Sequence, residues 1–120
     1  MSKPESTAGG AVLDLATADR EMRNEEAYVR EGHTARTLVR EPDLRIVLVV
    51  MKAGGLIAEH HVSRTASIHA LAGHVRLRIP GRDVDLPAGQ LLVLERGLRH
   101  DVEAVLDSAF LLTLGWQQGA

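Results

Sequence analysis

The chain of 120 residues contains no cysteine, which excludes disulfide bonds, thiolate metal sites and cysteine nucleophiles and favours a cytoplasmic protein. It has one Trp, one Tyr and one Phe, too few for a base-stacking surface or an aromatic sugar-binding platform. The longest apolar run, from Ile46 to Met51, is too short to cross a bilayer, and the first residues lack the apolar segment of a signal peptide. We therefore expect a soluble protein with no membrane partner.

The charge is nearly balanced, with 14 basic and 16 acidic side chains and a formal net charge of −2. Because the basic residues are scattered along the chain, we do not expect a nucleic-acid partner. A hydrophobic content of 45% over this length is enough for one buried core. We predict a flexible N-terminal tail over residues 1–11 and a single domain over residues 12–120.

Short segments rich in Val, Leu and Ile follow one another from His33 onward, separated by turn residues. Evenly spaced short strands are typical of an all-β sandwich or barrel. The clearest unit is a hairpin from Val75 to Leu86 that turns at Pro80 and Gly81, with opposite charges facing each other across the two strands.

The region before the strands predicts less regular structure. A short strand is expected from Val12 to Leu15, and a brief helix follows, capped by Thr17 or Asp19 and running to Tyr28. The fold class is therefore all-β with a short N-terminal helix.

Two predicted strands, Arg45 to Lys52 and Ser108 to Leu114, are apolar on both faces. The second face of each needs a cover, which either the N-terminal segment or a partner subunit supplies. We expect a homodimer.

Two histidines, His60 and His100, alternate with the apolar rather than the polar residues of their predicted strands. An imidazole among aliphatic side chains needs a hydrogen-bond partner, a metal or a ligand, because unpaired buried nitrogens cost on the order of 1–3 kcal/mol. The same alternation predicts a pocket around both rings. Its expected lining residues are Leu56, Ala58, Val62, Ile68, Leu98 and Val102.

The spacing of these histidines and of nearby glycines resembles the two motifs of the cupin family, over residues 36–114. The first motif is Gly, five residues, His, one residue, His, three or four residues, Glu, six residues, Gly. The second is Gly, five residues, Pro, one residue, Gly, two residues, His, three residues, Asn. The matching residues are Gly54, His60 and Gly73 in the first motif and Gly89, Gly97 and His100 in the second. The resemblance implies a double-stranded β-helix, or jelly-roll barrel.

The resemblance also implies a divalent transition metal (Zn, Fe, Ni, Cu or Mn) held by three histidines and a carboxylate. His60 and His100 match two of these ligands, whereas Val62 and Ala66 stand at the other two positions of the first motif. Nearby candidates for a further ligand are His61, His69, Glu59 and Glu95.

Three hypotheses remain open for the two histidines. They bind a divalent metal in the barrel, they bind a small molecule without metal in a binding or sensing protein, or they are core residues of a dimeric scaffold. If the protein is an enzyme, a metal-dependent oxygenase or an isomerase is the expected type. We favour binding over catalysis, because no carboxylate is placed to orient either ring.

Overall fold

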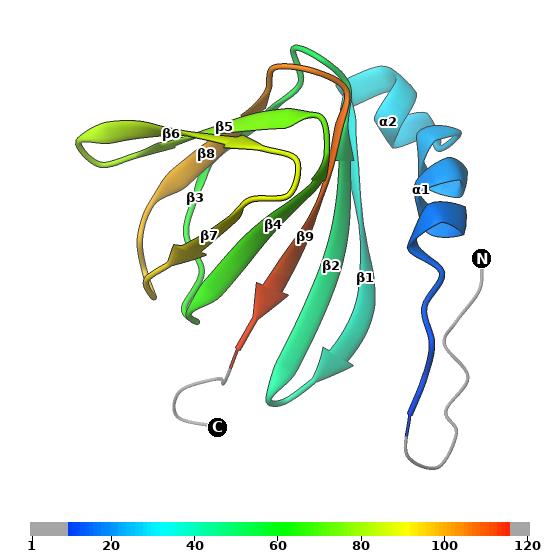
Figure 1. Cartoon of the computed structure of the whole chain (residues 1–120), viewed down its shortest axis with the longest axis horizontal. Helices are drawn as coiled ribbons and strands as arrows, with labels where there is room; N and C mark the ends of the chain where they lie inside the picture. Colours follow the sequence, from blue (N-terminus) through cyan, green and yellow to red (C-terminus); the bar gives the residue numbers. More distant parts are fainter. Residues whose placement is uncertain (1–9, 116–120) are drawn as a thin grey trace.

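The computed structural model describes residues 10–115, which form two antiparallel β-sheets and two short helices (Figure 1). The predicted tail over residues 1–11 lies outside the described residues except at Gly10 and Ala11. The helices are α1 (Leu15–Arg23) and α2 (Glu26–Glu31). The strands are β1 (His33–Glu41), β2 (Leu44–Met51), β3 (Leu56–His60), β4 (Ala66–Ala72), β5 (His74–Ile79), β6 (Arg82–Pro87), β7 (Leu91–Leu94), β8 (His100–Ala104) and β9 (Ser108–Leu114).

The larger sheet has the strand order β1-β2-β9-β4-β7 and the smaller one the order β3-β8-β5-β6. The two sheets face each other around one apolar core, which takes its residues from both (Figure 1). The fold class predicted from the sequence, an all-β jelly roll with a short N-terminal helical segment, is confirmed. Neither helix in residues 10–115 is long and apolar enough to span a membrane.

Strand β2 has two apolar faces because each one packs against a different layer. Val49 and Met51 belong to the core between the sheets, whereas Leu48 and Val50 belong to a second cluster with Met22 of α1. Figure 1 shows both helices beside β1 and β2, at the opposite edge of the sheet from β7. Of the two predicted covers, the N-terminal segment therefore covers the outer face of β2.

The helical segment differs in detail from the prediction. Residues 11–14 form no strand, and Asp14, not Thr17 or Asp19, caps α1 by accepting a hydrogen bond from the Thr17 backbone N–H at 3.0 Å. The segment forms two helices instead of one, and the second ends at Glu31, followed by the C-cap residue Gly32 with φ of +84°. Several polar residues in the first turns can serve as a cap, so the sequence alone does not select among them.

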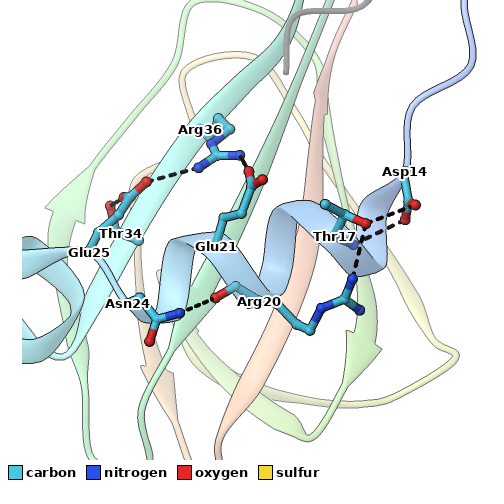
Figure 2. Close-up of polar contacts among 8 residues, drawn as sticks. All are labelled: Asp14, Thr17, Arg20, Glu21, Asn24, Glu25, Thr34 and Arg36. Atoms are coloured by element: carbon cyan, nitrogen blue, oxygen red, sulfur yellow. Dashed lines mark hydrogen bonds and ion pairs between the residues drawn. The ribbon is translucent and has the colours of Figure 1, made fainter. Parts of the chain in front are cut away.

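Arg36 of β1 ties both helices to the sheet (Figure 2). Its guanidinium donates to Glu21 at 2.8 Å and to Glu25 at 3.0 Å, and only 12% of the side chain is exposed. The hydrogen bond from Arg36 lowers the pKa of Glu21. Thr34 donates a further bond to Glu25 at 3.1 Å (Figure 2).

The Arg36→Met variant is expected to lower the melting temperature by several degrees, because it removes both charge-assisted bonds from a largely buried position. Arg30→Met is the matched control, since Arg30 makes its ion pairs on the surface of α2, where its side chain is 60% exposed. Thermal unfolding followed by circular dichroism checks both variants. Equal shifts would contradict a special role for Arg36.

Candidate functional site

The structure brings His60 and His100 together. The two residues lie directly opposite each other on β3 and β8, and their ring centroids are 4.3 Å apart with the planes tilted by 60°. His100 is 2% exposed and His60 is half-buried. Two residues forty positions apart in the sequence thus form one polar spot inside the barrel.

A β-bulge in β3 decides which of its residues face inward. Ile57 pairs with Val102 and His60 pairs with His100, so β3 advances by three residues while β8 advances by two. The extra residue reverses the alternation, and Ile57 joins His60 on the inner face.

The predicted lining is therefore wrong for part of the set. Leu56 is 51% exposed and Ala58 is also exposed, because the bulge turns them outward. Val62 and Leu98 are half-buried against the core but do not line the cavity. Of the six residues expected there, two do so, namely Ile68 and Val102.

The cavity beside the two rings has a volume of about 170 Å³ and is apolar apart from the imidazoles. Both sheets contribute to its wall. The lining residues are Ala35, Val47, Val49, Ile57, His60, Ile68, His100, Val102, Phe110 and Leu112. Half of this wall comes from β1, β2 and β9, which alternation around the histidines did not assign to the pocket. The sequence feature that could have identified this part of the wall is the presence of apolar residues on both faces of β2 and β9.

Each ring is held by a hydrogen bond to the backbone two residues earlier. Nδ1 of His60 lies 3.0 Å from the Ala58 carbonyl oxygen, and Nδ1 of His100 lies 3.1 Å from the Leu98 carbonyl oxygen. A carbonyl only accepts hydrogen bonds, so Nδ1 carries the proton in both rings. In the neutral rings Nε2 therefore keeps its lone pair and can accept a hydrogen bond.

Burial lowers the pKa of His100 below its usual value of 6.5, and the nearby His60 adds to this effect against the opposing bond to Leu98. The neutral form of His100 thus prevails at pH 7. Since an imidazolium has no lone pair, the acceptor at Nε2 exists only in the neutral ring.

We expect the free energy of unfolding to fall as the pH drops from 7 through 6.5 toward the lowered pKa of His100. Over that range the unfolded chain binds a proton at this position more readily than the folded chain does. His100→Gln should make the pH dependence shallower, whereas His69→Gln, at an exposed position, should leave it unchanged. Urea unfolding at several pH values measures both slopes, and an unchanged slope for His100→Gln would contradict the expectation.

The remaining ligand candidates do not join the pair. His61 and His69 are both exposed and neither lines the cavity. Glu59 lies on the surface, 3.8 Å from Arg99, and Glu95 is exposed. Within residues 10–115 no group of three or more His, Asp or Glu residues is placed to hold a metal ion. The donors present therefore do not fit the three-histidine, one-carboxylate centre that the family resemblance implied.

Comparisons with protein-family models and with curated proteins give no match. Among solved structures, the chain is similar to a conserved protein of unknown function from Streptococcus pyogenes, with 26% identity and a TM-score of 0.74 over 99% of this chain and 98% of that one. A cupin-2 domain-containing protein from Shewanella frigidimarina shares 13% identity with a TM-score of 0.69, over 87% of this chain and 94% of that one.

A third similar structure is a variant of salicylate 1,2-dioxygenase from Pseudoaminobacter salicylatoxidans. It shares 16% identity with a TM-score of 0.77, over 86% of this chain and 34% of that chain. Likeness at such low identity establishes architecture and not activity. The facing antiparallel sheets and these structural neighbours together show that the chain is a small protein with the cupin fold.

Proposed function

We propose that the protein binds a small, largely apolar molecule that donates a hydrogen bond to Nε2 of His60 or His100. The observation that carries the proposal is the pairing of two imidazole acceptors in an otherwise apolar cavity of about 170 Å³. Apolar pockets with a few polar anchors are the usual form of small-molecule sites. No Asp or Glu is among the residues described as lining the cavity, which favours binding over acid–base catalysis.

The proposal is tested with phenol and toluene, which have similar shapes but differ in one hydrogen-bond donor. We expect phenol to bind roughly tenfold more tightly than toluene, the value of about one net hydrogen bond. Replacing both histidines together, His60→Leu with His100→Leu, should erase this preference while keeping the cavity apolar. Chemical-shift titration by NMR measures each affinity.

The matched control is the same substitution at an exposed histidine outside the cavity, His69→Leu, which should leave the preference for phenol intact. If the wild-type protein binds phenol and toluene equally, or binds neither, the proposal is wrong. Destabilisation by the His60 and His100 replacements without any effect of either probe would favour the remaining hypothesis, a core role in a structural scaffold.

A divalent transition metal is the second candidate. It is favoured by the two adjacent rings, because the protons on their Nδ1 atoms leave the lone pair of each Nε2 atom available to coordinate a metal. Two imidazoles form an incomplete site, so a bound molecule or water would have to supply the other ligands. Elemental analysis of protein purified without a polyhistidine tag checks this candidate. One metal ion per chain, lost in His60→Leu, would support it, and a metal-free preparation whose melting temperature ignores added metal would exclude it.

We also propose that a second copy of the chain covers the outer face near the β7 edge. Leu91 and Val93 are 58% and 62% exposed there, and Leu91 pairs with the exposed His69 of β4. Val93→Glu should therefore convert a dimer into a monomer in light scattering after size exclusion. Val29→Glu, at an equally exposed position of α2, is the control. A wild-type protein that is monomeric at high concentration would overturn this proposal.

A further inference from the structure

A second pocket of about 270 Å³ lies beyond the apolar cavity, and its polar residues are mostly basic. Two strands connect the two spaces. Arg45 is two residues from Val47 on β2, and Leu114 is two residues from Leu112 on β9, so each pair shares a face. Two residues along a strand span roughly 7 Å. The pocket residues are Arg45, His61, Val62, Ser63, Arg64 and Leu114.

The two arginines of this pocket are withdrawn from solvent, Arg64 almost fully and Arg45 in part. Arg64 is 7% exposed. Nε of Arg45 is buried and, among residues 10–115, has no hydrogen-bond partner. A guanidinium stays charged and has only donors, so a buried unpaired N–H is costly until an acceptor reaches it. None of the residues described as lining this pocket is a carboxylate.

Besides its unpaired N–H, Arg45 experiences charge repulsion from its neighbour across the sheet. Arg45 and Arg40 lie directly opposite each other on β2 and β1. Like charges in that position destabilise a pair of strands. An anion beside Arg45 would relieve this repulsion and would also supply the missing acceptor.

We infer that this basic pocket binds the carboxylate of the ligand whose apolar part occupies the cavity. A planar carboxylate matches the guanidinium fork, and the adjoining Val62 and Leu114 suit the carbon chain attached to it. The inference rests on the proposed function and narrows the ligand class. The ligand is a small amphipathic acid with a hydrogen-bond donor for the histidines at one end, a short apolar spacer, and a carboxylate for Arg45 at the other.

Three probes that share a flexible six-carbon chain test this inference without assuming an exact distance. They are 6-hydroxyhexanoate, hexane-1,6-diol and 6-amino-1-hexanol. We expect 6-hydroxyhexanoate to bind the wild-type protein at least roughly tenfold more tightly than the neutral diol, and the cationic amine to bind most weakly. The advantage of the acid over the diol should shrink as salt is added.

Arg45→Met should remove the advantage of the acid and leave binding of the diol unchanged. Arg45→Lys should retain part of it, because the charge remains while the fork is lost. Arg82→Met is the matched control, since Arg82 is exposed on β6 in the other sheet. Circular dichroism and phenol binding show whether each variant is folded.

The outcomes separate this inference from the proposed function. If the acid and the diol bind equally well, the proposal of a carboxylate site is wrong, whereas the proposal of ligand binding at the histidine cavity is unaffected. The carboxylate site is also wrong if Arg45→Met is folded, binds phenol and keeps the full preference for the acid. If none of the three six-carbon probes binds while phenol does, the carboxylate site is wrong. If phenol does not bind either, both proposals are wrong.

Discussion

Gly73→Ala is expected to destabilise the protein on the order of 3–5 kcal/mol, enough to unfold many domains of this size. Gly73 has φ of +75°, where residues with a side chain are strained. A Cβ atom there would lie 2.1 Å from the Asp107 carbonyl oxygen and 2.4 Å from Oγ of Ser108. Backbone atoms cannot rotate out of the way as a flexible side chain does.

The contact also disturbs a buried polar link. Ser108 is fully buried, and its Oγ accepts a hydrogen bond from the His74 backbone N–H at 3.0 Å and donates one to the Leu106 carbonyl oxygen at 2.7 Å. Displacing this hydroxyl leaves buried backbone groups unpaired. Gly73 thus fixes the junction where β4 turns into β5 beside the start of β9.

Gly81→Ala is the matched control for this prediction. Gly81 has φ of +85°, but a Cβ atom there would meet nothing within 4 Å. The control should therefore show only the cost of the backbone conformation, about 1 kcal/mol. Urea unfolding compares the two variants, and a similar loss in both would show that the contacts at Gly73 are unimportant.

The positions of glycines and the alternation of apolar residues predicted much of this fold. The hairpin expected from Val75 to Leu86 is present as β5 and β6, with its turn at Pro80 and Gly81. The expected pairing of opposite charges is also present, since Arg76 donates to Asp85 at 2.9 Å. These features are local, so a short stretch of sequence contains all the residues that determine them.

The site was less predictable because it depends on contacts between distant strands. Alternation placed His60 on the inner face but also placed Ala58 there, and a single bulge in β3 reversed the second assignment. A bulge arises from the register between two strands, which one strand's sequence does not reveal. Arg45 was not predicted as a pocket residue for a similar reason. It lies near the start of an apolar strand, and only the folded barrel places it with Arg64 at one pocket.

Ala35→Phe is expected to abolish phenol binding, whereas Ala58→Phe is expected to preserve it. Ala35 of β1 lines the cavity opposite the two histidines' strands, and its neighbour across the sheet is Val49. A benzyl side chain at Ala35 has nearly the size of phenol itself and would fill the space the probe needs. Ala35 and Ala58 are both exposed, but Ala35 is on the cavity wall and Ala58 is not, so the same side chain at Ala58 lies outside the cavity.

This pair of variants distinguishes the observed inner face of the barrel from the one that simple alternation predicts. Both substitutions keep the two imidazoles, and the backbone carbonyl of Ala58 that holds His60 is also kept, so what differs between the variants is access to the cavity. NMR titration with phenol, with circular dichroism to verify folding, provides the measurement. If Ala58→Phe blocks binding and Ala35→Phe does not, the assignment of a bulge to β3 is wrong, and the cavity lies on the face of β3 that strict alternation predicts.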